Sequence, residues 1–203
     1  MNCSRSVSFG LLVAAAAYAA APVAAAPPAR PWEFIIIHHS ATRTGNAEEF
    51  DASHRARGMI NGLAYHFVID NGTADMPDGH VEVGTRWTTQ LHGGHCRQGY
   101  INERGIGICL VGNFSNDQPT AKQLDALALL IRGLQFQFKI ADDHVLGHGE
   151  VIGEFSECPG KEFPWAELRK RLQPLVGAPF QARPAQVQTE QSRPEGRSHN
   201  PGP

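Results

Sequence analysis

The feature that most constrains the fold is a buried strand that runs directly into a pair of histidines. Residues 34–37 read Phe-Ile-Ile-Ile, and His38 and His39 follow. Such a run is typical of a strand covered on both faces. Successive side chains of a strand point to opposite faces, so the two histidines cannot enter one pocket. We expect one to be a metal or substrate ligand and the other a packed or surface residue. A hydrogen-bonded structural histidine is the alternative.

Both ends of the chain differ in composition from a folded domain. Residues 1–26 combine Arg5, an apolar stretch from Phe9 to Ala21 and an Ala-x-Ala pattern, which is typical of a secretory signal peptide. An uncleaved N-terminal anchor is the alternative. Residues 177–203 are rich in Pro, Gln and Arg and almost free of apolar side chains, which predicts a disordered tail. Residues 31–176 remain as one domain, and we expect a periplasmic or secreted protein with no stable membrane association.

Charge and cysteine content narrow the possible partners of this domain. Residues 31–176 contain 18 acidic and 13 basic side chains, a net charge of −5. Nucleic-acid-binding domains are typically basic, so this charge argues against nucleic acid as a partner. Three cysteines follow the signal peptide, Cys96, Cys109 and Cys158. In an oxidising compartment an odd number means that at least one is unpaired or has another role. No heptad seam is visible, so we expect a monomer.

Local patterns predict alternating helices and strands. Capping-box patterns at Asn46 and Thr120 and a proline at position 164 mark three helix starts, the first ending near Arg57. Besides the first strand, we expect strands at residues 64–70, 80–87 and 105–112. The predicted fold class is α/β, a single domain with a central mixed β-sheet flanked by helices.

A second histidine and a cysteine complete a candidate metal set. His148 lies in the segment Gly-His-Gly-Glu-Val, and Cys158 follows ten positions later. With His38, they make two imidazoles and a thiolate, a common zinc ligand set that leaves the fourth tetrahedral position for water. Bound zinc lowers the pKa of that water, so the three residues are a candidate hydrolytic centre. A plain loop histidine and a core or disulfide-bonded cysteine are the alternatives.

Four segments carry a family resemblance. They are, in order, residues 37–42, 65–69 and 105–114, and 147–151 together with 158–160. They resemble the successive motifs of the type-2 N-acetylmuramoyl-L-alanine amidases, a family that includes phage lysozyme-type amidases and peptidoglycan recognition proteins. The resemblance extends from about Trp32 to Leu172. It implies a zinc-dependent hydrolase that cleaves the amide between the lactyl group of N-acetylmuramic acid and L-alanine in peptidoglycan or muropeptides.

The resemblance also implies roles for individual residues. His38, His148 and Cys158 would hold one zinc ion, which leaves His39 on the opposite face. Tyr65, at the start of the Tyr-His-Phe segment, would lie beside the zinc. Its phenol would donate to the oxygen on which negative charge develops in the transition state. A core aromatic residue is the alternative for Tyr65.

One position departs from the family pattern. Ser156 stands two residues before the last ligand, where several members carry a lysine that stabilises the transition state. We assign Ser156 to the catalytic set, although a hydroxyl is a weaker electrostatic partner than an ammonium group. Glu150, Glu154 and Glu157 are expected to be solvated surface charges, so no general base is assigned.

The segment from Gln90 to Asn102 resembles the part of the family that lines the substrate groove. His95 and Asn102 match best, and Arg97 is available for a substrate carboxylate. A surface loop with a buried histidine is the alternative. A Cys96–Cys109 disulfide would leave Cys158 for zinc, but the sequence does not show whether its geometry is permitted.

Two other functions remain open from the sequence. A non-catalytic peptidoglycan-binding module would keep the fold but lack a zinc ligand, whereas this chain has all three. A thiol hydrolase that used Cys158 and His148 would be inactivated by alkylation and indifferent to chelators.

Overall fold

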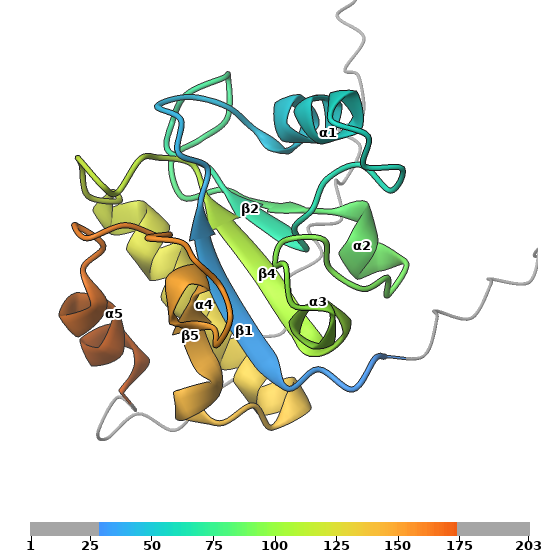
Figure 1. The fold of residues 1–203 in the computed structure, drawn as a ribbon. Helices are drawn as coiled ribbons and strands as arrows, with labels where there is room; N and C mark the ends of the chain where they lie inside the picture. Colours follow the sequence, from blue (N-terminus) through green and yellow to red (C-terminus); the bar gives the residue numbers. More distant parts are fainter. Residues whose placement is uncertain (1–28, 174–203) are drawn as a thin grey trace, which may run out of the picture. The chain divides into compact units, whose positions relative to one another are not determined.

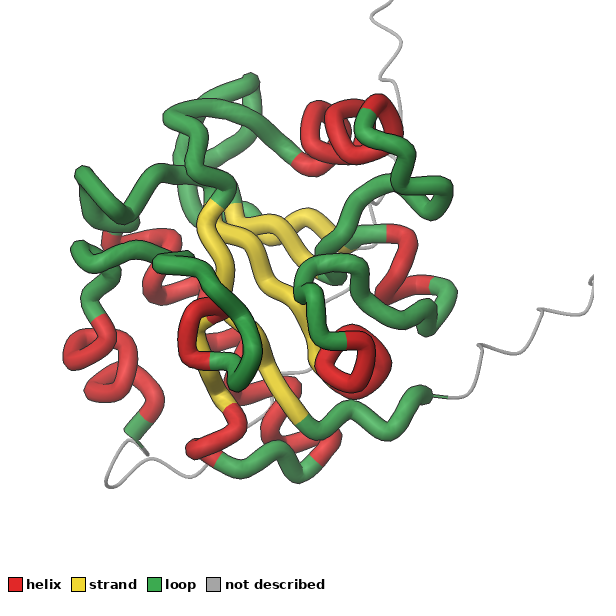
Figure 2. Tube along the Cα trace, in the orientation of Figure 1, coloured by secondary structure: helices red, strands yellow, loops and turns green. Residues whose placement is uncertain are grey.

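A computed structural model describes residues 29–173, so the expected signal peptide and tail lie outside the described residues. The described part contains a five-stranded sheet in the order β3-β2-β4-β1-β5. Its strands are β1 (Phe34–His39), β2 (Phe67–Ile69), β3 (Val81–Val83), β4 (Gly105–Leu110) and β5 (Val145–Gly147). β1 pairs in parallel with β4 and β5, β2 pairs in parallel with β4, and β3 is antiparallel to β2. The sheet is therefore mixed, as predicted (Figures 1 and 2).

Helices cover both faces of this sheet (Figure 1). They are α1 (Ala47–Ala56), α2 (Thr85–Thr88), α3 (Gly99–Arg104), α4 (Ala121–Phe138) and α5 (Trp165–Leu172), with 3₁₀ turns η1 (Asp142–His144) and η2 (His148–Glu150). α4 and α5 pack on one face, and α1 and α3 lie over the other. None of the helices between residues 29 and 173 is long and apolar enough to cross a membrane.

The helix starts follow the predicted caps. The Asn46 side chain accepts the backbone N–H of Glu49, and α1 begins at the next residue after Asn46. Thr120 and Gln123 form a reciprocal capping box at the start of α4. α5 begins directly after Pro164. Satisfied N-terminal N–H groups explain why the starts of α1 and α4 are readable from sequence alone.

Three predicted strands are shorter than expected, so those predictions are wrong at their ends. The strand expected at residues 105–112 ends at Leu110. The backbone of Ala64 bonds to the His54 ring and to Gly94 rather than to a neighbouring strand, and β2 begins only at Phe67. At the third strand, the backbone N–H groups of Trp87 and Thr88 bond to the carbonyl of Gly84 and start α2. The predicted strand 80–87 therefore ends at Val83.

Candidate metal centre

The end of the sheet brings the two predicted histidine ligands together. His38 is the fifth residue of β1, and the parallel register pairs Ile37 with Gly147 at the end of β5. His148 is the residue after Gly147, so it emerges beside His38, and the two ring centroids lie 4.6 Å apart. His39 points the other way, and its Nδ1 accepts the backbone N–H of Phe114. This arrangement follows from strand alternation.

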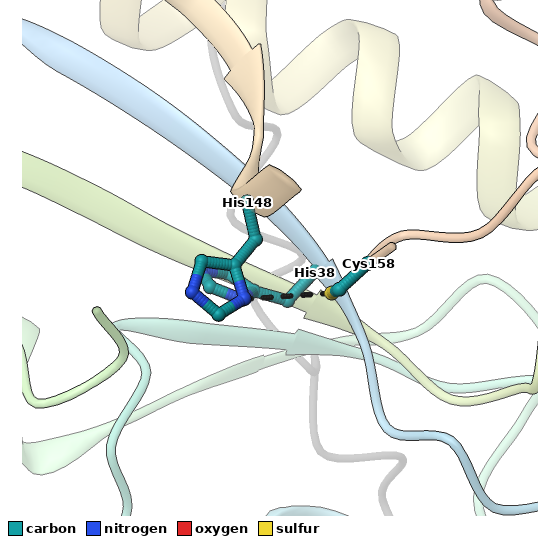
Figure 3. A group of neighbouring side chains, drawn as sticks. All are labelled: His38, His148 and Cys158. Carbon is teal, nitrogen blue, oxygen red and sulfur yellow. Dashed lines mark hydrogen bonds between the residues drawn. The ribbon is translucent and has the colours of Figure 1, made fainter. Parts of the chain in front are cut away.

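The loop after η2 folds back and delivers Cys158. The backbone N–H of Gly149 donates to the Cys158 carbonyl over 2.7 Å. A Cβ atom at Gly149 would lie 2.1 Å from the Ser156 carbonyl oxygen, so only glycine permits this approach. The Cys158 Sγ consequently lies 3.8 Å from the His38 Nδ1 (Figure 3). It also accepts the backbone N–H of His39.

The chemistry of this set fits a zinc ion. One ligand atom from each of His38, His148 and Cys158 lies within 4.8 Å of the others. Burial lowers the pKa of His38 well below its ordinary value, and neighbouring histidine rings lower it further, so the ring is neutral as a ligand must be. Burial raises the pKa of the Cys158 thiol to about 11, against the lowering effect of the His39 N–H. A bound cation would favour the thiolate, as at other cysteine-containing zinc sites.

The far nitrogen of each histidine ring faces a protein partner. The His38 Nε2 lies 3.1 Å from the His95 Nδ1, and the His95 Nε2 lies 3.3 Å from the Gly105 carbonyl oxygen. Gly107 makes room, because a Cβ there would lie 2.4 Å from the His95 ring. The His148 Nε2 lies 3.1 Å from the Glu154 Oε2. These partners leave the Nδ1 atoms for a metal.

His95 was expected in the substrate groove, and the structure puts it behind His38 instead. It is only 7% exposed, and burial lowers its pKa to about 4. Both of its ring nitrogens face protein atoms. The placement supports a role in orienting His38 rather than contact with substrate.

Glu154 corrects the expectation that the three glutamates near Cys158 are surface charges. Its side chain is only 1% exposed, whereas Glu150 and Glu157 are exposed as predicted. Burial raises the pKa of Glu154, but the hydrogen bonds that its carboxylate accepts from Gln98, Arg97 and His148 outweigh this, and the net pKa is lowered. A buried carboxylate stays charged where such donors compensate for lost hydration.

Tyr65 lies beside the candidate ligands, as the resemblance implied. Its ring centroid is 5.2 Å from that of His38. Burial raises the pKa of its phenol well above the ordinary value, and the neighbouring Cys109 and Cys158 raise it further, so the phenol keeps its proton. Tyr65 also lines a pocket of about 300 Å³ with residues of α1 and the turn after β1. No local sequence signal indicates this pocket, because only the fold brings α1 over the sheet.

The other predicted site residues are Arg97, Asn102 and Ser156. The Arg97 side chain is exposed. The Asn102 side chain stabilises the backbone at residues 95 and 96, since its Oδ1 accepts the N–H groups of His95 and Cys96. The Ser156 Oγ accepts the backbone N–H of Cys158. Ser156 thus shapes the ligand loop, and its catalytic role stays a prediction.

The cysteines between residues 29 and 173 are all unpaired, so the Cys96–Cys109 disulfide is not formed. Cys96 packs against the cluster that contains Ile36, whereas Cys109 belongs to a different cluster with Val68. Different packing environments explain why the two thiols do not meet. Cys158 is nevertheless available as a ligand.

Comparisons with known proteins indicate the family of the chain. A family model described as N-acetylmuramoyl-L-alanine amidase matches residues 28–161. Peptidoglycan recognition proteins of Trichoplusia ni and Bombyx mori are 37% and 31% identical over 149 and 147 residues, covering 70% of this chain in both cases and 76% and 70% of the relatives. The solved N-acetylmuramoyl-L-alanine amidase LysC from Clostridium intestinale URNW has a TM-score of 0.61 at 28% identity, covering 75% of this chain and 94% of that one. The chain therefore belongs to the N-acetylmuramoyl-L-alanine amidase family.

Proposed function

We propose that this protein is a zinc-dependent N-acetylmuramoyl-L-alanine amidase. It hydrolyses the amide between the lactyl group of N-acetylmuramic acid and L-alanine in peptidoglycan or muropeptides. Water adds across the C–N bond and yields a lactyl carboxylate and a free amine on L-alanine. The observation that carries the proposal is the convergence of His38, His148 and Cys158 on one point beside Tyr65.

The residues of the chain divide the work of this reaction. Zinc, when bound, supplies the Lewis acid that lowers the pKa of water and polarises the amide carbonyl. His38, His148 and Cys158 would hold the ion, and three protein ligands leave a position open to substrate or water. Tyr65 keeps its proton and donates it in a hydrogen bond to the carbonyl oxygen as negative charge develops there.

Arg97 is the residue that we assign to a charged group of the substrate. Arg97 projects an exposed guanidinium from the loop next to Glu154 and would pair with a carboxylate of the stem peptide. The substrate lies in the cell wall, which agrees with a periplasmic or secreted, monomeric protein carrying a signal peptide at residues 1–26.

A second candidate function is recognition of peptidoglycan without hydrolysis. The names of the relatives from Trichoplusia ni and Bombyx mori favour it, as does Ser156 in place of a lysine. The complete ligand set with Tyr65 favours catalysis instead. A thiol hydrolase is less compatible with the site, because burial keeps the Cys158 thiol protonated and the His148 Nε2 is engaged by Glu154.

The test is hydrolysis of purified peptidoglycan by the full chain, with mass spectrometry of the released peptides. We expect stem peptides with a free N-terminal L-alanine, lost after chelation and restored by zinc. Stoichiometric zinc with peptidoglycan binding but no released amine would establish the recognition module instead. Activity that survives chelation but is lost on alkylation would establish the thiol hydrolase.

A further inference from the structure

Glu154 is a buried charge in the loop between two candidate ligands, and its placement calls for a reason. Its side chain is 1% exposed, while the apolar Ile152 and Phe155 on either side are 95% and 90% exposed. Burying a carboxylate costs free energy unless hydrogen bonds replace its hydration. At these three positions the charged side chain therefore faces inward and the apolar side chains face outward, which is the reverse of ordinary hydrophobic burial.

The carboxylate makes three hydrogen bonds that divide between two parts of the site. Its Oε2 accepts from the Nε2 of His148 at 3.1 Å. Its Oε1 accepts the backbone N–H groups of Arg97 at 2.5 Å and Gln98 at 3.0 Å. One side chain thus joins the candidate metal ligand His148 to the backbone of Arg97 and Gln98.

The bond to His148 determines which ring nitrogen carries the proton. A charged carboxylate only accepts, so the His148 Nε2 must donate and its Nδ1 must keep a free lone pair. Carboxylates in this position fix the tautomer and the orientation of metal-binding imidazoles. The bonds from the Arg97 and Gln98 N–H groups hold that part of the backbone against Glu154. A further bond strengthens this contact, since the Gln98 Nε2 donates to the Gly153 carbonyl.

We propose that Glu154 is a positioning residue that holds His148 in its metal-binding tautomer and fixes the Arg97–Gln98 backbone to the same point. The inference deepens the proposed zinc amidase function and rests on it for the identity of the metal. It also links metal binding to substrate binding, because the backbone of Arg97 and the ring of His148 bond to the same carboxylate.

Another use of the same atoms is a second metal position. Cys96, His148 and Glu154 also offer ligand atoms within 4.8 Å of one another. Glu154 would then have to exchange its bond from His148 for a metal bond, and His148 would have to give up its Nε2 proton. Both oxygens of the Glu154 carboxylate already accept hydrogen bonds, which favours the positioning role. Metal stoichiometry distinguishes this role from a second metal position.

The test compares Glu154→Gln with the matched control Glu157→Gln, an exposed carboxylate of the same loop. Zinc affinity is measured by competition with a chromophoric chelator, and cobalt substitution reports ligand geometry through its absorption spectrum. We expect Glu154→Gln to weaken zinc binding by about 10–100-fold and to change the cobalt spectrum. Glu157→Gln should match the wild type in both, and Glu154→Asp, which keeps the charge, should recover part of the affinity. In the active variants, KM should rise together with a fall in kcat, because the backbone of Arg97 and Gln98 is released as well.

Unchanged zinc affinity and cobalt spectrum in a folded Glu154→Gln variant would overturn the inference. So would two zinc ions per wild-type chain, one of them lost in both Glu154→Gln and Cys96→Ser, since Glu154 would then be a ligand. If the substitutions prevent folding, the nitrogen chemical shifts of His148 in the metal-free wild type decide: the Nε2–H tautomer supports the inference and the Nδ1–H tautomer contradicts it. Normal zinc affinity without amidase activity would count against the proposed function alone.

Discussion

The two faces of the central sheet use buried side chains in opposite ways. Toward α4 and α5 the strands present mainly apolar groups, among them Ile35, Ile37 and Ile108, and His39 at the end of β1 is the polar exception. The face under α1 and α3 carries His38, which is equally buried but hydrogen-bonded. Adjacent residues of one strand therefore have different roles. On the first face apolar packing stabilises the fold, and on the second face hydrogen-bonded polar groups orient the candidate ligand His38. Substitutions on the first face should therefore lower the free energy of unfolding, whereas substitutions on the second face should lower metal binding and activity.

His38→Ala should give the largest effect. It removes a buried ligand and leaves the His95 Nδ1 without its ring partner. We expect amidase activity to fall to background and zinc content to fall from stoichiometric to near zero, while circular dichroism stays close to that of the wild type. A folded variant that retains zinc would show that this face does not hold the metal through His38.

Ile37→Ala is the matched substitution on the other face. Ile37 is fully buried in the cluster that packs on α4. Deleting its methyl and methylene groups should lower the free energy of unfolding by about 2–5 kcal/mol. Chemical denaturation measures the loss. Zinc content and kcat of the folded fraction should not change, and a parallel loss of zinc would contradict the separation of the two faces.

Tyr65→Phe removes one donor from the polar face without removing a ligand. We expect kcat to fall by about 10²–10³, as when one oxyanion donor is lost. Zinc affinity should equal that of the wild type, which a chelator competition assay checks. A variant with normal kcat would exclude the phenol from the chemistry and leave Tyr65 as a packing residue.

The polar face also contains one group that lacks partners. Asp70 is fully buried, and neither of its carboxyl oxygens has a hydrogen-bond partner among the described residues. Burial, and then the nearby Glu82 carboxylate, raise the pKa of Asp70 to about 7. Glu82 itself accepts the backbone N–H of Ala47 at the start of α1. An unfolded aspartic acid titrates near pH ~4, so the folded state loses stability as the pH rises from about 4 to about 7.

Asp70→Asn should therefore raise the free energy of unfolding at pH 8, because the neutral amide cannot ionise and can donate to Glu82. The gain should shrink as the pH falls and vanish near pH ~4, where the acid is protonated in both states. Denaturation curves at several pH values give this profile, with the exposed Asp75→Asn as control. A gain that does not depend on pH would mean that Asp70 does not titrate in this range.

The sequence predicted the apolar face better than the polar one, for a physical reason. β1 and α4 follow from local signals, an apolar run and a capping box, which act over a few residues. The three-residue strand β5 has no such signal and depends on pairing with β1. Glu154 was misread because hydropathy places glutamate outside, whereas its burial depends on donors more than fifty positions away, the N–H groups of Arg97 and Gln98.

The candidate ligands could be named from the sequence because a family motif carries them, but their supporting contacts could not. His38, His148 and Cys158 stand in motif segments, so their identities could be read in advance. His95 was assigned to the groove, since a glycine-rich loop gives no sign that Gly107 leaves space for its ring on the sheet. Residues that orient ligands are specified by three-dimensional packing, and the sequence pattern shows only the ligands.

The most direct test of the metal centre is X-ray absorption at the zinc edge of the purified wild-type protein. We expect a first shell with one sulfur at about 2.3 Å and two imidazole nitrogens at about 2.0–2.1 Å, completed by a lighter ligand. This result would confirm a site built from His38, His148 and Cys158. A shell without sulfur, or with two sulfurs that implicate Cys96, would contradict it.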